Sequence, residues 1–293
     1  MIKATTIEQV REAISQAREK LRQANQQDGS NLIGFVPTMG ALHAGHFSLI
    51  DTARRECGFV VVSIFVNPTQ FGPNEDYERY PRPLEQDLAG CESHGVDLVF
   101  VPTVEQMYPA GFSTTVRVSG VTEMMEGQFR PGHFDGVCTV VAKLFSIVGA
   151  DVAYFGAKDY QQAVVIKRMV ADLNLPTRIV VCPTIREKDG LAISSRNTYL
   201  DKHERAQAAG LYGSLQLAEE LIHNGQRNAK EIIRAVRRHL AEHAPLGKID
   251  YVAVVDPESL QPVDEIKDDV VIALAVRFPS ARLIDNIRVD VKS

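Results

Sequence analysis

The chain has 293 residues, enough for one large domain or two domains of ordinary size, and 45% of them are hydrophobic. Its 37 acidic and 32 basic residues leave a formal net charge of −5, which argues against a nucleic-acid or membrane-surface binder. There is no apolar run of ~18 residues and no signal-peptide core, so a cytoplasmic protein without a membrane span is expected. The four cysteines, none in a CxxC pair, are expected to be buried reduced thiols.

The first 185 residues alternate between helical and strand-like patterns. Apolar residues at three- and four-residue steps predict a helix over residues 7–27, ended by Asp28-Gly29. The elements expected after it are strands at 32–36, 59–66, 97–102, 114–118, 151–156 and 177–183 and helices at 46–57, 84–93, 136–148 and 160–173. This alternation is typical of an α/β protein with a Rossmann-like, doubly wound parallel sheet, whose strand ends and ligand share one edge.

The pattern changes after residue 185. Helical stretches are expected at 203–223 and 228–243, followed by strands in KIDYVAVVDP and DDVVIALAVRF. We therefore expect two domains: a Rossmann-like domain over residues 1–185 that binds the ligands, and a smaller C-terminal α+β domain over residues 186–293. The second domain is expected to close over the site about a short hinge.

The segment PTMGALHAGH, residues 37–46, lies where the first buried strand turns into a helix. Unpaired backbone N–H groups and the helix dipole favour phosphate there, and Gly40 and Gly45 allow a backbone to approach a ligand closely. His43 and His46 can donate hydrogen bonds to an α-phosphate that gains charge under attack. Two histidines framing a glycine favour a catalytic turn over an ordinary strand–helix turn. The pattern is neither a Walker A loop nor a GxGxxG fingerprint.

The segment FVNPTQFG, residues 65–72, follows the next buried strand. Asn67 and Gln70 offer both hydrogen-bond donors and acceptors, which suits a small polar substrate carrying hydroxyls or a carboxylate. Asn-Pro is also a normal way to start a turn, so this segment alone leaves both interpretations open.

The segment FGAKDYQQ, residues 155–162, forms another strand-to-helix junction. Lys158 can bind phosphate there, and Gln162 lies one helical turn beyond Asp159, on the same side. Asp159 can equally serve as a helix cap.

The segment DGLAISSRN, residues 189–197, places two hydroxyls and a guanidinium after a glycine turn. Ser194, Ser195 and Arg196 together would make a good clamp for a triphosphate. Taken alone, the segment is also compatible with a solvated loop.

The four segments together resemble the pantothenate synthetase family, within the HxGH nucleotidyltransferases. The resemblance extends to FRPGHFDGV at 129–137 and ARLIDN at 281–286 and so covers most of the chain. HxGH alone marks only the superfamily, whereas its combination with FVNPTQF, GxKDxQQ and SSRN is specific to the family. The sequence departs from the usual family pattern at three positions. Ala44 stands where the family usually has an acidic residue, Ala157 where it usually has Glu, and Ile193 where it usually has Met.

The resemblance implies an ATP-dependent ligase that condenses (R)-pantoate with β-alanine to pantothenate, releasing AMP and pyrophosphate. Pantoate would first become pantoyl adenylate, and the amine of β-alanine would then displace AMP. Magnesium would accompany ATP, its protein ligands being left open, with Asp87 as a candidate. A homodimer is also implied.

Residue roles follow from the same resemblance. His46, with His43 and Lys158, would be catalytic. Gln70 would contact pantoate and β-alanine, and Gln162 would hold pantoate; Asn67 and Arg130 are further substrate-binding candidates. The residues implied to bind ATP are Met39, Gly40, Ala41, Leu42, His43, Ala44, Gly45, His46, Gly156, Ala157, Lys158, Asp159, Ile185, Ile193, Ser194, Ser195 and Arg196.

Three alternative functions fit the sequence less well. An adenylyltransferase acting on a mononucleotide would need a basic site for the substrate phosphate, and the amides of FVNPTQF argue against it. A non-enzymatic nucleotide-binding module would not need the histidines, Lys158 and the SSR segment at once. A metal site formed by His43, His46 and His133 lacks a fourth ligand.

Overall fold

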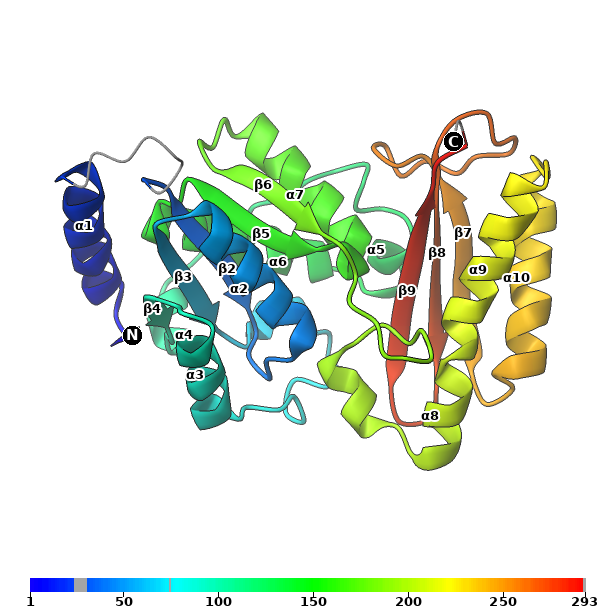
Figure 1. Cartoon of the computed structure of the whole chain (residues 1–293), viewed down its shortest axis with the longest axis horizontal. Helices are drawn as coiled ribbons and strands as arrows, with labels where there is room; N and C mark the ends of the chain where they lie inside the picture. Colours follow the sequence, from blue (N-terminus) through cyan, green and yellow to red (C-terminus); the bar gives the residue numbers. More distant parts are fainter. Residues whose placement is uncertain (24–30, 74, 292–293) are drawn as a thin grey trace. The chain divides into compact units, whose positions relative to one another are not determined.

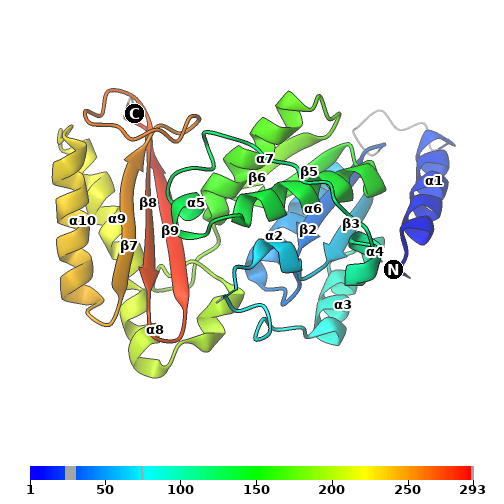
Figure 2. The ribbon, with the colours of Figure 1, turned by 180° about the vertical axis from the view of Figure 1, so that it is seen from behind.

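The computed structural model describes residues 1–23, 31–73 and 75–291 (Figures 1 and 2). They form two compact units. Unit 1 comprises Met1–Val118, Arg130–Ala157 and Gln162–Pro183, and unit 2 comprises Ser119–Phe129, Lys158–Gln161 and Thr184–Ser293. Two short segments that precede residue 185 therefore belong with the C-terminal part of the chain. The expected closure of a second domain over the site stays a prediction.

Unit 1 is built on a six-stranded parallel sheet. Its strands, in spatial order, are β1 (Ile2–Ala4), β4 (Leu98–Phe100), β3 (Phe59–Ile64), β2 (Ile33–Thr38), β5 (Val152–Gly156) and β6 (Arg178–Cys182). The central strands are buried almost throughout, which explains their nearly continuous apolar sequences. From β2 the chain runs through β3 to β4 on one side, whereas β5 and β6 are added on the other. The order of the strands thus reverses between β2 and β5, where sheets of this kind bind their ligands.

Helices cover both faces of this sheet (Figures 1 and 2). On one face lie α2 (Ala44–Glu56) and α3 (Leu84–Ser93), and on the other α6 (His133–Val148) and α7 (Tyr160–Asp172). At the β1 edge of the sheet, α1 (Ile7–Gln23) packs against β1, β4 and α6. The single turn α4 (Val104–Met107) follows β4. The predicted doubly wound α/β fold is confirmed.

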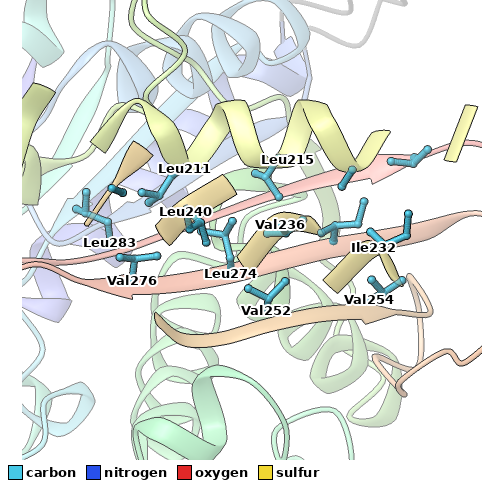
Figure 3. Close-up of a cluster of buried hydrophobic side chains, with 14 of the residues drawn as sticks. Leu211, Leu215, Ile232, Val236, Leu240, Val252, Val254, Leu274, Val276 and Leu283 are labelled. Atoms are coloured by element: carbon cyan, nitrogen blue, oxygen red, sulfur yellow. The ribbon is translucent and has the colours of Figure 1, made fainter. Parts of the chain in front are cut away.

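Unit 2 contains a three-stranded antiparallel sheet in the order β7 (Lys248–Val255), β8 (Val270–Arg277) and β9 (Arg282–Val289). Two helices that pack against each other, α9 (Gly210–His223) and α10 (Ala229–His243), cover it and are preceded by the short α8 (Lys202–Ala208). Apolar side chains from both helices and all three strands interdigitate in one core (Figure 3). The single turn α5 (Glu126–Phe129) also belongs to this unit. The predicted smaller α+β unit is confirmed.

Two local predictions are wrong. Residues 114–118 alternate in sequence like a strand but form none, because the backbone N–H of Val116 donates to Oγ1 of Thr139, at 3.0 Å, instead of to a neighbouring strand. The helix expected over 203–223 is interrupted at Ala209. Gly210 follows this break, and a Cβ there would lie 3.1 Å from Cβ of His243.

The remaining expectations concern the cysteines, a helix end and membrane spans. All four cysteines are free and buried, as predicted. The expected helix end at Asp28-Gly29 lies outside the described residues. Within the described ranges, no helix combines the length and apolarity needed to cross a membrane.

Candidate active site

A tight turn follows β2 at the edge of the sheet where the strand order reverses. The backbone N–H of Gly40 donates to Oγ1 of Thr38, at 3.1 Å, and this hydroxyl donates to the carbonyl of Ser63 on β3, at 2.7 Å. Gly40 and Ala41 both have positive φ values, 84° and 50°. The left-handed backbone turns the chain sharply from the strand into the helix, which is why glycine suits position 40.

His43 and His46 brace the first turn of α2. His43 is the N-cap, and its Nδ1 accepts the backbone N–H of Gly45 at 3.2 Å. Nδ1 of His46 faces the backbone N–H of His43 at 3.4 Å. Because an Nδ1 that accepts a backbone N–H cannot carry the proton of a neutral ring, each neutral imidazole has its proton on Nε2. Both rings are therefore Nε2–H donors, as stabilisation of a charged phosphate requires.

The buried carboxylate of Asp87, on α3, binds the backbone of the same turn. Its two oxygens accept the backbone N–H groups of Ala41, at 2.8 Å, and Leu42, at 2.7 Å. Burial raises the pKa of Asp87, and the two N–H donors partly offset that rise. Sequence reasoning treated Asp87 only as a candidate for magnesium, whereas here it fixes the backbone of the predicted phosphate-binding turn.

Asn67 and Gln70 lie together at the end of β3, around the single 3-10 turn η1 (Pro68–Gln70). Both side chains are buried, and Nδ2 of Asn67 donates to Oε1 of Gln70 at 2.9 Å. The predicted pair of amides is thus brought together, with Asn67 behind Gln70. Both follow a parallel strand whose carboxyl end lies at the same sheet edge as the turn after β2.

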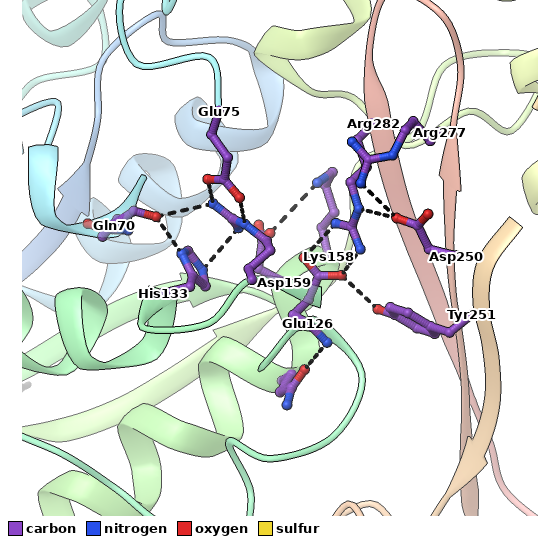
Figure 4. A network of polar contacts seen from close by, with 12 residues as sticks. Gln70, Glu75, Glu126, His133, Lys158, Asp159, Asp250, Tyr251, Arg277 and Arg282 are labelled. Carbon is purple, nitrogen blue, oxygen red and sulfur yellow. Dashed lines mark hydrogen bonds and ion pairs between the residues drawn. The ribbon is translucent and has the colours of Figure 1, made fainter. Parts of the chain in front are cut away.

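Arg130 holds the backbone of Gln70. It forms a bidentate ion pair with Glu75, both distances being 2.7 Å, and donates to the Gln70 carbonyl at 3.3 Å (Figure 4). His133 also contacts this carbonyl, through Nδ1 at 2.9 Å, while its Nε2 accepts from Arg130 at 3.1 Å. Burial alone would raise the pKa of Glu75, but the Arg130 guanidinium lowers it below its ordinary value. These contacts favour a supporting role for Arg130.

The two adjacent glutamines that open α7 differ in their contacts. Gln161 is buried, and its amide donates to the carbonyls of Val121 and Met124, at 2.9 and 2.8 Å, while accepting the N–H of Glu126 at 3.0 Å. Gln162 is half-buried in unit 1, after the β5 strand. Gln161 therefore orders unit 2, and substrate binding by Gln162 stays a prediction.

In unit 2, Lys158 is held through its backbone. Its carbonyl accepts Nδ2 of Asn286 at 2.7 Å, and its ammonium group lies 3.8 Å from Asp159. Asn286 belongs to the ARLIDN segment, for which the sequence suggested no role. That segment therefore orders one of the predicted phosphate-binding residues.

The predicted triphosphate clamp follows a short antiparallel turn in unit 2. Ile193 donates its N–H to the carbonyl of Ile185, at 3.0 Å, so these two predicted ATP-binding residues are paired. Oγ of Ser194 caps the next 3-10 turn, η3 (Ser195–Tyr199), by accepting the N–H of Arg196 at 3.3 Å. The SSR segment is therefore an ordered cap and not an extended loop.

Arg186 anchors the start of this turn. It forms two hydrogen bonds to the buried Asp285, at 2.7 and 2.9 Å, and its guanidinium carbon lies 3.9 Å from the centre of the Tyr212 ring. It also donates to the carbonyls of Gly190, at 3.0 Å, and Asn286, at 3.3 Å. A bidentate pair and a stacked ring fix a guanidinium better than a single ion pair.

A second buried ionic cluster ties the segment before Arg130 to the sheet of unit 2. Arg282 donates to both oxygens of Glu126, at 2.7 and 2.8 Å, and to Asp250 at 2.7 Å (Figure 4). The Tyr251 hydroxyl donates to Glu126 at 3.1 Å, and burial raises the pKa of Tyr251. Nothing in the sequence marked Glu126, because its partner lies 156 positions away.

The described part of the chain contains no group of three or more His, Cys, Asp or Glu residues arranged to hold a metal ion. In particular, His133 is bonded to Arg130 and Gln70 and does not join His43 and His46 in such a group.

Comparison with known proteins identifies this arrangement. The family model for pantoate–β-alanine ligase matches residues 4–288. The chain belongs to this family. It is 53% identical over 283 residues to the pantothenate synthetase of Acetivibrio thermocellus, covering 96% of this chain and 99% of that protein. The enzyme of Chloroflexus aurantiacus is 56% identical over 257 residues, covering 87% and 91%.

Solved structures of the family agree with the fold. The pantothenate synthetase of Thermus thermophilus superposes with a TM-score of 0.87 at 48% identity, covering 98% of this chain and 99% of that one. The ligase of Francisella tularensis, solved with βγ-ATP and β-alanine, gives a TM-score of 0.75 at 36% identity, covering 100% and 98%.

Proposed function

We propose that this chain condenses (R)-pantoate with β-alanine at the expense of ATP, forming pantothenate, AMP and pyrophosphate. The observation that carries the proposal is the pair of Nε2–H donors, His43 and His46, at the start of α2. They follow β2, beside the point where the strand order of the parallel sheet reverses. That position concentrates N–H donors where a phosphate would bind.

In the first step, a carboxylate oxygen of pantoate attacks the α-phosphorus of ATP, and the bond to the bridging oxygen of pyrophosphate breaks. Negative charge grows on the α-phosphate oxygens, where Nε2–H of His46 would donate a hydrogen bond that strengthens in the transition state. Lys158 and the SSR segment would bind the other phosphates, and magnesium would enter as part of the substrate MgATP.

In the second step, the amine of β-alanine attacks the acyl carbon of pantoyl adenylate. The bond to the AMP oxygen breaks, AMP leaves, and the nitrogen loses its proton as the amide forms. Because adenylation has already supplied a good leaving group, no serine or cysteine nucleophile is needed. This agrees with the four cysteines being buried and with the pKa values of Cys91 and Cys138 being raised by burial to about 12.

We further propose that Gln70 contacts both pantoate and β-alanine and that Gln162 holds pantoate. Asn67 and Arg130 would act mainly by supporting Gln70, because their polar groups already bind protein atoms. We also propose a homodimer, from the family resemblance, and a cytoplasmic location, from the free and buried cysteines. Sedimentation of the purified protein would test the first.

Oxygen transfer tests the proposed order of chemistry. Pantoate labelled with ¹⁸O in its carboxylate should give pyrophosphate with ATP alone and then, on addition of β-alanine, AMP carrying one labelled oxygen. Label retained only in pantothenate would exclude the adenylate. Nucleotidyl transfer to a mononucleotide, without any requirement for β-alanine, would favour the alternative adenylyltransferase.

A further inference from the structure

The side chain of Gln70 is buried, and of its two polar atoms only the oxygen forms a hydrogen bond within the described part of the chain. The residue is only 9% exposed, and its Oε1 accepts Nδ2 of Asn67 at 2.9 Å. Within the described part of the chain, its Nε2 has no hydrogen-bond partner. Two N–H bonds that point away from the protein's own acceptors suit a ligand that brings acceptor oxygens.

The orientation of this amide is fixed from behind by Asn67. Asn67 is fully buried, its Nδ2 faces the carbonyl of Gly136 at 3.2 Å, and its Oδ1 faces the backbone N–H of Thr69 at 3.4 Å. A flipped Asn67 would place oxygen against oxygen and N–H against N–H. Since Gln70 must then offer an acceptor to Nδ2 of Asn67, its Oε1 points to Asn67 and its NH₂ points away.

Tyr108 completes the arrangement. Its hydroxyl donates to Oδ1 of Asn67 at 2.8 Å, and the Thr69 hydroxyl adds a second donor at 3.0 Å. The ring is held by Phe112, with centroids 5.1 Å apart, and by Lys143, whose ammonium lies 5.7 Å from the ring centre. The Tyr108 hydroxyl also lies 3.3 Å from that of Thr69. Tyr108 is therefore placed by packing and acts on the Gln70 side chain through Asn67.

Close backbone packing leaves Gln70 little freedom to move. A Cβ added at Gly136 would lie 2.2 Å from the carbonyl oxygen of Thr69 and 2.9 Å from the backbone nitrogen of Gln70. The carbonyl of Gln70 is held from the other side by Arg130 and His133. Both the backbone and the side-chain oxygen of Gln70 are thus fixed.

We propose that Tyr108, Asn67 and Gln70 form a relay that presents the Gln70 amide as a two-donor group. Tyr108 is a positioning residue in this relay and does not contact substrate. The group recognised is an acceptor oxygen, of a hydroxyl or a carboxylate, on the acid substrate. Its identification with pantoate rests on the proposed function, whereas the donor polarity rests on the hydrogen bonds alone.

Tyr108→Phe tests the relay because it removes one hydroxyl and keeps the ring. We expect KM for pantoate to rise roughly three- to tenfold, the effect of about one hydrogen bond, while KM for ATP stays within twofold. Tyr154→Phe is the matched control. It also removes a buried hydroxyl in unit 1, one that donates to Glu56 at 2.9 Å, and it should lower stability without changing KM for pantoate.

Gln70→Glu tests the donor polarity with almost unchanged shape. Glu can still accept from Asn67 but offers oxygen where the amide offers N–H, so pantoate use should fall at least as far as in Gln70→Ala. Equal pantoate KM in Gln70→Glu and the unmodified enzyme would overturn the proposal, as would equal KM values in Tyr108→Phe and Tyr154→Phe. If Tyr108→Phe does not fold, Gln70→Glu decides. Failure of the unmodified protein to form pantothenate would instead refute the proposed function.

Discussion

The imidazole rings of His43 and His46 lie together at the start of α2, with centroids 4.1 Å apart and planes tilted by 37°. The close approach requires a glycine between them, since a Cβ at position 45 would lie 3.0 Å from Nδ1 and Cε1 of His43. Backbone N–H groups fix both Nδ1 atoms as acceptors. The turn therefore sets the direction of both Nε2–H donors before any substrate binds.

Replacing His46 by Ala should slow adenylate formation far more than it weakens ATP binding. The interaction is proposed to strengthen only as the α-phosphate gains charge, and loss of one preorganised donor typically costs about a hundred- to a thousandfold in rate. Single-turnover adenylation, ATP affinity and thermal stability should be measured on one preparation.

His94→Ala is the control for that experiment. His94 also lies half-buried in unit 1, where it pairs with Asp51 at 2.6 Å and stacks on Phe47. Its loss should affect stability and leave adenylation unchanged. A stable His46→Ala enzyme with full activity would contradict the catalytic role, and an unstable one would move the test to His46→Asn, which keeps a donor.

The neighbouring glutamines of α7 should separate substrate binding from structure. Gln162→Ala should raise KM for pantoate by at least about tenfold with little change in stability or ATP affinity, the effect of one lost hydrogen bond or more. Gln161→Ala should instead lower the free energy of unfolding by about 1–3 kcal/mol, because the carbonyls of Val121 and Met124 lose their buried donor. Steady-state kinetics and denaturant unfolding of both variants check this, and a reversed pattern would mean that the two roles are assigned to the wrong residues.

The sequence predicted the parallel sheet well because its strands are long apolar runs between helical patterns. It also placed the motif after β2 correctly, since glycines and histidines at a strand–helix junction have a local explanation. β9 was missed because Arg282, Asp285, Asn286 and Arg288 interrupt its apolar pattern. Two of these polar residues, Asp285 and Asn286, are buried because they bind residues far away along the chain, and the sequence of the strand gives no sign of these contacts.

The supporting residues of the candidate site were less predictable for the same reason. Asp87 binds a turn 46 positions earlier, and Glu126 binds Arg282 at a separation of 156 positions. Periodicity and turn chemistry describe neighbours along the chain, so they carry no information about such pairs. The polarity of Gln70 likewise depends on Gly136 and Tyr108, which no local pattern connects to it.

ATP should protect the segment 187–197 from amide hydrogen exchange. Ser194 and Arg196 are proposed to bind the triphosphate, and binding at an ordered cap suppresses local opening. Exchange should be measured by mass spectrometry with and without MgATP, using residues 229–243 of α10 as the internal reference. Equal exchange of segment 187–197 in both states would contradict a role for the SSR segment in ATP binding.

The ion pair of Glu75 with Arg130 should make stability depend on pH in the acid range. The Arg130 guanidinium outweighs the opposing effect of burial and holds the pKa of Glu75 below its ordinary value of 4.5. A carboxyl whose pKa is lowered by folding contributes stability above its unfolded pKa and loses that contribution as pH falls through the folded one. Glu75→Gln should therefore lower the melting temperature by a constant amount between about pH 5.5 and 7, and the difference should shrink below about pH 4.5. Glu78→Gln, which alters an exposed carboxylate of the same segment, should follow the unmodified protein throughout. A Glu75→Gln deficit that does not change down to the acid limit would show that Arg130 does not stabilise the charged form of Glu75.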